Sequence, residues 1–398
     1  MKILMALTYY RPHVSGLTIY VQRLAESLAA QGHEVTVLTS RYNSELPPEE
    51  EVNGIRIVRV PVLTRVSKGV VMPGFAAHAI RLLREHDVVS VHLPQFEASI
   101  LAWLGRFVVR RPVVLTYHCD LLLPPGLFNR LVDQVIFVSN YLAGLWADAI
   151  VAYTEDYAVH SRFLSKFPQK RHVIPPPVHV PIPEPAAVRS FAGAHRLDGK
   201  PVVGFAARFA TEKGVEYMLG AIPYILRQMP DVRVLFAGEY KNVVGEDTYR
   251  KRLQPLLERY KDHWTFLGVL DPREMASFYA ACDVTVLPSI NSTESFGLVQ
   301  VESMLCGTPV CASNLPGVRM PVRTTGMGEV VPIRDSAALA AAIVKVMQHP
   351  EAYRRSREEV AGHFSTERTR DEYVRLFTRL LVEQHRSIIP AEEGKASD

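Results

Sequence analysis

The sequence has few cysteines, no strong charge of either sign and no long hydrophobic run. Its 398 residues include four cysteines and none is in a Cys-x-x-Cys pair, so the pattern favours reduced thiols. The formal net charge is +4, and the sequence lacks the dense basic stripe of nucleic-acid-binding proteins. So mild a positive charge is compatible with an anionic small molecule as ligand, or with weak attraction to an acidic membrane surface. The longest apolar stretch near residue 100 is interrupted by Arg106 and is too short to cross a bilayer.

Three other signals are missing. No GxGxxG follows the first expected strand, which argues against a nicotinamide oxidoreductase. No His/Cys/Asp cluster has metal-ligand spacing, so we expect neither a metal nor a cofactor. The opening MKILMALTYYRP has a strand pattern without a signal-peptide cleavage site, so we expect a cytoplasmic protein, with peripheral attachment to the inner face of a membrane as the further option.

Short β-rich runs alternate with helical patterns along the chain, which predicts an α/β fold with parallel sheets. The proline-rich IPPPVHVPIPEP cannot be a central strand or helix and predicts an interdomain linker at 181–199. The two halves, 1–180 and 200–365, each open with a strand, a glycine-containing loop and a helix. Two such domains facing each other would form a cleft at the carboxyl ends of their strands. A helix is expected at about 368–385, and 386–398 has the composition of a disordered tail.

The segment GFAARFATEKG places Arg208 and Lys213 between a strand and a helix that begins near Gly214. Two cations beside free backbone amides suit a diphosphate. The alternative is a pair of solvated surface cations, and their place in a strand-to-helix loop favours the phosphate site.

Two glutamates, Glu294 and Glu302, bracket the apolar run of TESFGLVQVES. We expect Glu294 in a loop and a helix that begins near Phe296 or Gly297, with Ser295 as a possible cap. Glu302 would then lie roughly 9 Å along that helix, which matches the span from hexose to ribose in a nucleotide sugar. Carboxylates suit the diols of both sugars, because each can accept from two hydroxyls. An ordinary capped helix and a glycosidase pair are the alternatives, and diphosphate-binding cations would be superfluous in a glycosidase.

The front half offers weaker candidates. Gly16 stands at a helix start that a phosphate could approach, although a plain turn accounts for it equally well. His118 and Asp120 end a strand in TYHCD, where both would face a ligand, with His118 toward the reacting carbon. A structural histidine at a strand end remains the alternative.

Together these segments resemble the retaining glycosyltransferases of family four, which have the GT-B fold of two facing Rossmann-like, doubly wound domains. TESFGLVQVESMLCGTPVCAS resembles the family's E-x7-E motif and following strand, and GFAARFATEKG its Arg–Lys phosphate loop. GLTIYVQRLAESLAAQGHEVTVLT resembles the N-terminal signature, and ADAIVAYTEDYAVHSRFL with VIPPPV the approach to the linker. The resemblance covers about residues 1–385. One departure is Ser15-Gly16, where the family often has two glycines.

The resemblance implies metal-independent transfer of a hexose from a UDP- or GDP-linked sugar, with the anomeric configuration retained. Glu294 and the adjacent backbone would hold the hexose, Glu302 the ribose, and Arg208 with Lys213 the diphosphate; His118 would lie near the anomeric centre. The further donor-binding positions would be Gly16, Val269, Ser295, Phe296, Gly297 and Leu298, with Asp120 on the acceptor side. The family pattern has no well-placed protein nucleophile, which implies attack from the face of the leaving phosphate.

The acceptor is less defined by the residues. The segment 121–146 is unusually apolar, which indicates either a membrane-facing surface for a lipid-linked acceptor or a helix packed on the first sheet. The acceptor would be a sugar or a lipid-linked hydroxyl of a cell-envelope glycan. A sugar-nucleotide epimerase or hydrolase of the same fold and a non-catalytic nucleotide-sugar-binding protein remain as rival functions.

Overall fold

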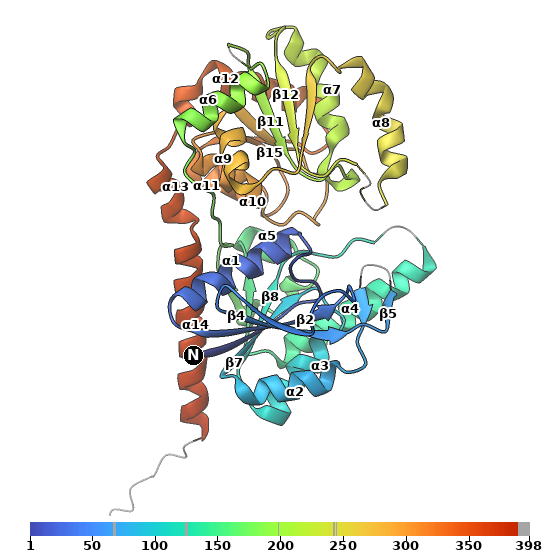
Figure 1. Cartoon of the computed structure of the whole chain (residues 1–398), viewed down its shortest axis with the longest axis vertical. Coiled ribbons are helices and arrows are strands. Elements are labelled where there is room, and N and C mark those ends of the chain that lie inside the picture. The colour runs from blue at the N-terminus through green and yellow to red at the C-terminus, as the bar shows by residue number, and fades with distance from the viewer. Residues whose placement is uncertain (67–68, 124–125, 198, 242, 244, 389–398) are drawn as a thin grey trace, which may run out of the picture. The chain divides into compact units, whose positions relative to one another are not determined.

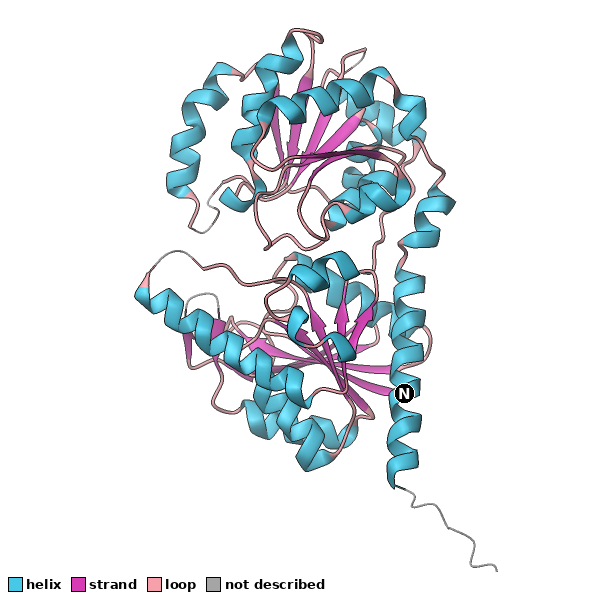
Figure 2. Ribbon diagram, turned by 180° about the vertical axis from the view of Figure 1, so that it is seen from behind, coloured by secondary structure: helices cyan, strands magenta, loops and turns pink. Residues whose placement is uncertain are grey.

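The computed structural model describes residues 1–66, 69–123, 126–197, 199–241, 243 and 245–388, and the chain divides into two compact units. Unit 1 contains Met1–Tyr153, Ala158–Pro177 and the chain from Thr366 onward. Unit 2 contains Thr154–Tyr157 and Val178–Ser365. Each unit has one large sheet with helices on both faces (Figures 1 and 2).

Unit 1 has an eight-stranded sheet in the order β10-β9-β8-β7-β1-β2-β4-β3, parallel except for β3. The strands are β1 Lys2–Ala6, β2 Glu34–Arg41, β3 Glu49–Val52, β4 Ile55–Pro61, β7 Val88–Leu93, β8 Val113–Tyr117, β9 Ala149–Ala152 and β10 Arg171–Val173. A separate hairpin pairs β5 Thr64–Val66 with β6 Gly69–Val71. The central strands are buried along their whole length, which explains their continuous apolar runs.

The helices of unit 1 surround this sheet. They are α1 Gly16–Ala30, α2 Phe75–Glu85, α3 Ala98–Trp103, which continues into the π-helical η1 Leu104–Val109, α4 Leu127–Trp146 and α14 Thr366–Ile388. The short α5 Glu155–His160 begins in unit 2 and ends in unit 1, and the 3-10 turns η2 Leu164–Lys166 and η3 Pro168–Lys170 precede β10.

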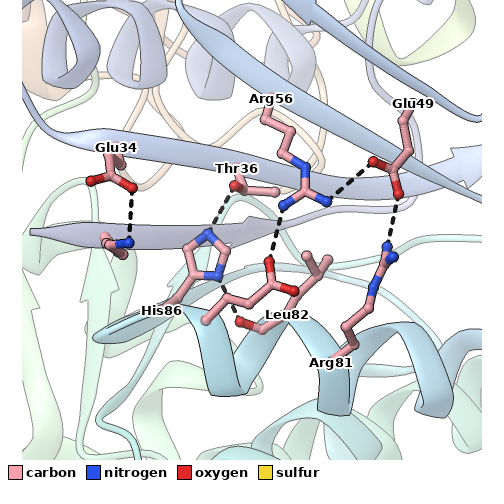
Figure 3. Close-up of polar contacts among 9 residues, drawn as sticks. Glu34, Thr36, Glu49, Arg56, Arg81, Leu82 and His86 are labelled. Carbon is pink, nitrogen blue, oxygen red and sulfur yellow. Dashed lines mark hydrogen bonds and ion pairs between the residues drawn. The ribbon is translucent and has the colours of Figure 1, made fainter.

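Polar contacts fasten α2 to the neighbouring strands (Figure 3). The His86 ring lies 2.8 Å from the Thr36 hydroxyl and 2.6 Å from a carbonyl in the last turn of α2. Arg56 of β4 donates to Glu49 of β3 at 3.1 Å, and Arg81 of α2 donates to the same carboxylate at 2.8 Å. The hydrogen bond from Arg81 is the main cause that lowers the pKa of Glu49.

The C-terminal helix α14 is part of unit 1 and packs against α1. Its Tyr373 is fully buried, and the Tyr373 hydroxyl lies 2.8 Å from that of Tyr20 and 2.7 Å from that of Thr116. These bonds satisfy polar atoms that would otherwise be costly to bury. Of the predicted tail 386–398, residues 386–388 are the end of α14, and 389–398 lie outside the described residues.

Unit 2 has a six-stranded parallel sheet in the order β13-β12-β11-β14-β15-β16. The strands are β11 Val202–Ala206, β12 Arg233–Ala237, β13 Trp264–Gly268, β14 Val284–Leu287, β15 Val310–Ser313 and β16 Gly328–Val331. The helices are α6 Pro185–Ala194, α7 Val215–Leu226, α8 Asp247–Arg259, α9 Pro272–Ala280, α10 Leu298–Leu305, α11 Met320–Thr325, α12 Ser336–Gln348 and α13 Arg357–His363, with the 3-10 turns η4 Thr211–Lys213 and η5 Pro350–Tyr353. Phe205, Phe236 and Trp264 pack as an aromatic cluster in its core.

The predicted linker at 181–199 differs from what the structure contains. The chain passes from unit 1 to unit 2 at Pro177, and the helix α6 occupies Pro185–Ala194 within the predicted linker. Proline is at the first position of α6, where its missing amide hydrogen costs nothing, so the end of the proline-rich run starts a helix.

Candidate functional site

The candidate donor site lies where the strand order of unit 2 reverses. β11 and β14 are neighbours at the centre of the sheet, and the chain proceeds outward from them in opposite directions. The loop after β11 carries Arg208 and Lys213, and the loop after β14 carries Glu294. Ligands of open α/β sheets bind at such a reversal, outside the carboxyl ends of the strands.

The two loops meet through an ion pair. The Lys213 Nζ lies 2.6 Å from Glu294 Oε2, and the two side chains are 21% and 15% exposed. Arg208 is more accessible, with 52% of its side chain exposed, and it pairs with Glu212 at 3.0 Å. The accessible Arg208 and the partly buried Lys213–Glu294 ion pair therefore lie in the loops after β11 and β14, at the carboxyl ends of these strands.

Backbone contacts fix the distance between these loops. The amide of Ile290 donates to the Glu212 carbonyl at 3.0 Å. Gly214 has φ of +66°, and a Cβ there would lie 2.1 Å from the Pro288 carbonyl oxygen. Glycine is therefore required at Gly214, both for the left-handed turn into α7 and for this close approach.

The loop after β14 is anchored by buried residues. Ser295 and Phe296 are buried, and the Phe296 ring lies 5.6 Å from that of Phe364. The Gln300 amide donates to the Phe296 carbonyl at 2.7 Å and to the Val318 carbonyl at 2.9 Å. Glu294 therefore projects from a loop whose following residues belong to the core.

The predicted helix start near Phe296 or Gly297 is correct to within one or two residues, but the predicted cap, Ser295, is wrong. Helix α10 begins at Leu298, and Gly297, with φ of +80°, is its N-cap residue in place of Ser295. Burial of the Phe296 ring in the core imposes a turn that only glycine makes easily. Glu302 is consequently little more than one turn into α10, about 6 Å from its start.

Glu302 is held by a neighbouring helix. Tyr279 of α9 donates its hydroxyl to Glu302 Oε2 at 3.0 Å. Tyr279 is buried, so its hydroxyl is a fixed donor that orients the carboxylate. Val269, 78% exposed, follows β13 at the same edge of the sheet.

Asp156, which the sequence did not single out, makes further contacts at the Glu294 loop. Asp156 accepts from Arg319 Nε at 2.9 Å and from the Gly317 amide at 2.8 Å. A Cβ on Gly317 would lie 2.0 Å from the Ser295 carbonyl oxygen, so the Gly317 turn lies directly against the Glu294 loop. Tyr157 adds a hydrogen bond to the Ser292 carbonyl at 3.1 Å. The segment TEDY gives only a weak signal for this role, since Asp156 lies in the short helix α5, a few residues after β9.

The predicted residues of unit 1 lie in the segments that follow β1 and β8. Gly16 is the first residue of α1, and a Cβ there would meet no atom within 4 Å. Ser15 is the N-cap of α1 and accepts from the Thr18 amide at 3.2 Å, which explains a serine there. Asp120 accepts from the Tyr117 hydroxyl at 2.8 Å and from the Ser161 hydroxyl at 2.7 Å.

His118 is buried, with 5% of its surface exposed. Its Nε2 lies 3.0 Å from Nδ1 of His92, and its Nδ1 is bonded to the Tyr153 hydroxyl. Burial is the main cause that lowers the pKa of both imidazoles, that of His92 to about 3 and that of His118 well below its usual value. Both rings are therefore neutral at pH 7.

Comparison with known proteins places the chain in a family. The family model described as "Glycosyl transferases group 1" matches residues 190–362, and the one described as "Glycosyl transferase 4-like domain" matches 15–177. The phosphatidyl-myo-inositol mannosyltransferase of Mycolicibacterium smegmatis is 28% identical over 361 residues, 87% of this chain and 85% of that protein. The D-inositol 3-phosphate glycosyltransferase of Geodermatophilus obscurus is 30% identical over 393 residues, 91% and 84% of the two chains.

Solved structures agree on the fold. Sucrose-phosphate synthase from Thermosynechococcus elongatus superposes with a TM-score of 0.75 at 24% identity, covering 96% of this chain and 99% of that one. Anabaena HepE in complex with UDP superposes with a TM-score of 0.76 at 20% identity, covering 95% and 100%. The predicted fold class, with two Rossmann-like α/β domains, is confirmed. The chain belongs to the group 1, GT4-like glycosyltransferases with the GT-B fold.

Proposed function

We propose that the protein is a metal-independent, retaining hexosyltransferase that uses a UDP- or GDP-linked sugar and a lipid-linked hydroxyl acceptor. The observation that carries the proposal is the joining of Lys213 and Glu294, 81 positions apart in sequence, at the strand reversal of unit 2. Two cations, Arg208 and Lys213, and two carboxylates, Glu294 and Glu302, follow strands of the same sheet. Such a set of side chains fits a nucleotide diphosphate sugar, and so does membership of a transferase family.

Arg208 and Lys213 act on the diphosphate. Breaking the bond between the sugar C1 and the phosphate oxygen places negative charge on the leaving diphosphate, and positioned cations stabilise that charge. Lys213 is held in place by Glu294, whereas Arg208 stays accessible at the surface of the loop. The cations take the role that a divalent metal has in other transferases.

The carboxylates bind the two ends of the donor. Glu294, with the backbone of Ser295, Phe296 and Gly297 and the start of α10 at Leu298, holds hexose hydroxyls. Glu302 accepts from the ribose hydroxyls, since Tyr279 keeps its carboxylate oriented. Backbone at Val269 meets the base, because it follows β13 at the same edge. Gly16 leaves room for backbone approach to phosphate in unit 1.

Retention follows from attack on the face that the diphosphate leaves. The acceptor oxygen bonds to C1 as the C1–O bond to phosphate breaks, and the acceptor proton passes to the departing phosphate oxygen. No protein nucleophile is required. A trapped glycosyl–enzyme adduct would contradict this route.

His118 would lie near the anomeric carbon, and its uncharged imidazole ring suits that position. The transition state gains positive charge on the sugar, which a protonated imidazole would oppose. Burial and the contact with His92 keep the His118 ring uncharged. Asp120 belongs to the acceptor side, where its bonds to Tyr117 and Ser161 fix the loop that follows β8.

The acceptor assignment is supported by the relatives. The mannosyltransferases among them are named for a phosphatidyl-inositol acceptor, a lipid whose reacting group is a hydroxyl. We extend this class to the present chain, which would then work as a peripheral protein at the inner face of a membrane.

The test is nucleotide release from a panel of UDP- and GDP-hexoses, with and without lipid extract and with EDTA present. We expect release from one nucleotide class, stimulated by lipid and insensitive to EDTA. Lys213→Ala should lower the rate at least tenfold, and Lys261→Ala, an exposed lysine paired with Glu258 elsewhere in unit 2, should leave it unchanged. Turnover that does not depend on lipid and yields an isomerised sugar nucleotide would show that the protein is an epimerase instead. Nucleotide binding without turnover would show that it is a non-catalytic binding protein.

A further inference from the structure

The imidazole ring of His118 is held at both of its nitrogens. Nε2 lies 3.0 Å from Nδ1 of His92, and Nδ1 is bonded to the Tyr153 hydroxyl. The three side chains come from neighbouring strands, since His92 is in β7, His118 follows β8 and Tyr153 follows β9. All three are buried, so water competes little for these bonds. The two partners therefore fix the plane of the ring and determine which nitrogen carries the proton.

The Tyr20 ring of α1 packs against both His118 and Tyr153. Its centroid lies 4.9 Å from that of His118, and the two rings are nearly perpendicular at 83°. It also stacks on the Tyr153 ring at 5.3 Å and 23°. Both arrangements are among those that aromatic pairs prefer. Because Tyr20 contacts the imidazole and also the tyrosine that bonds to it, a shift of the Tyr20 ring would displace both.

The Tyr20 hydroxyl is fixed in turn by the C-terminal helix. Helix α14 packs against α1 (Figure 1), and its Tyr373 hydroxyl lies 2.8 Å from the Tyr20 hydroxyl and 2.7 Å from that of Thr116. Thr116 is in β8, two residues before His118. Tyr373 is therefore connected to His118 in two ways, through the Tyr20 ring and through the strand that leads to the histidine. We call Tyr20, Thr116, Tyr153 and Tyr373 the hydroxyl network.

Packing alone does not require the hydroxyl network. Phenylalanine or valine of nearly the same shape would fill the same space, and neither needs a hydrogen-bond partner. A buried polar network that is fully satisfied makes its members rigid and gives them one arrangement. In the proposed function, His118 is the residue beside this network that lies near the reacting carbon. The network is therefore suited to hold the His118 ring in one orientation.

We propose that Tyr153 and Tyr373 are positioning residues for His118, so that helix α14 helps to hold the imidazole in the orientation and tautomer that the transfer reaction uses. The inference rests on the proposed function, in which His118 lies near the anomeric carbon. Both tyrosines act through His118 and not on the substrate. Removing either hydroxyl should therefore slow the chemical step and leave donor binding, which we assign to unit 2, unchanged.

The experiment is steady-state kinetics of the full-length protein with the UDP- or GDP-hexose that supports transfer. Tyr153→Phe and Tyr373→Phe each remove one hydroxyl and keep the ring. We expect kcat to fall at least about fivefold, the effect of one lost hydrogen bond, while the KM for the donor stays within about twofold. Thr116→Val removes a hydroxyl without changing the shape of the side chain and should lower kcat in the same way. Thr116→Ser keeps the hydroxyl and should retain the wild-type kcat.

Tyr353→Phe is the matched control. Tyr353 of unit 2 is also buried, and its hydroxyl donates to Glu329, outside the hydroxyl network. Its removal should lower the stability in urea to a similar extent without changing kcat. An equal loss of kcat in this control would overturn the proposal, because the effect would then follow from lost stability. A wild-type kcat in Tyr373→Phe, or a loss confined to the KM for the donor, would overturn it as well.

A second measurement does not depend on turnover. Nitrogen-15 nuclear magnetic resonance of the histidine-labelled protein reports which ring nitrogen is protonated, and His118→Gln assigns the His118 signals. We expect one tautomer of His118 in the wild type and a mixture of both in Tyr153→Phe and Tyr373→Phe. Signals that Tyr373→Phe leaves unchanged would overturn the proposal. A wild type that transfers no sugar, with the expected change in the His118 signals, would refute the proposed function and still support the positioning of the ring.

Discussion

Replacing Glu302 by alanine removes the carboxylate that we assign to the ribose hydroxyls. Hydrogen bonds to a charged group are worth about 1.5–3 kcal/mol each, and Glu302 is half-buried, so a loss of about 2 kcal/mol of nucleotide affinity is a conservative value. That loss weakens binding about 30-fold.

Thermal unfolding of the two proteins converts this loss into a measurable shift. Nucleotide at about 100 times its wild-type dissociation constant stabilises the wild type by about 2.7 kcal/mol. At the same concentration, a site that is about 30-fold weaker gains only about 0.9 kcal/mol. The midpoint shift of Glu302→Ala should therefore fall to about one third of that of the wild type.

Two controls separate direct contact from disturbance of the site. Tyr279→Phe removes only the hydroxyl that orients Glu302, so it should cost about 1 kcal/mol of nucleotide affinity or less. The 2′-deoxynucleotide should bind the wild type more weakly than the ribonucleotide, yet Glu302→Ala should not distinguish the two. An unchanged midpoint shift in Glu302→Ala, or continued discrimination between the two sugars, would refute the assignment.

Three further predictions concern other parts of the structure. Lys213→Met should weaken a nucleoside diphosphate far more than the nucleoside, as isothermal titration would measure, and an equal loss for both ligands would contradict the phosphate role. Gly297→Ala should lower the free energy of unfolding by at least about 1 kcal/mol in urea, because its φ is +80° and a Cβ would lie 2.3 Å from the Leu287 side chain; full stability would contradict this packing. For His92, a folded pKa of about 3 against 6.5 unfolded means that the neutral ring stabilises the protein above pH 6.5 and that this stability is lost as pH falls toward 3. His92→Gln should therefore flatten the dependence of stability on pH across that window, and an unchanged slope would show that other groups cause it.

The position of the loop that carries Arg208 and Lys213 could be predicted because its signal is local. A strand, two cations and a glycine follow one another within the short segment GFAARFATEKG, and Arg208 and Lys213 lie where that pattern places them. The pairing of Lys213 with Glu294 depends instead on which strands are neighbours. Sheet order is a long-range property, so the sequence indicated both residues without indicating the ion pair between them.

The errors arose where packing overrides local preference. Serine is a good N-cap, yet with Phe296 buried the N-cap of α10 is the positive-φ Gly297. A proline-rich run predicts a linker, yet the last of its prolines begins α6. Asp156 gave little signal because its partner Arg319 is 163 positions away. The exposed side of α4 could not be assigned from composition, since an apolar helix has the same residues whether it is buried or not.

The most direct test of the central claim is nuclear magnetic resonance of the product formed from an anomerically pure sugar nucleotide and a lipid acceptor. The proposed mechanism predicts a new glycoside with the anomeric configuration of the donor and one nucleoside diphosphate released for each sugar transferred. An inverted glycoside, free sugar formed at the same rate without acceptor, or an isomerised sugar nucleotide would contradict it.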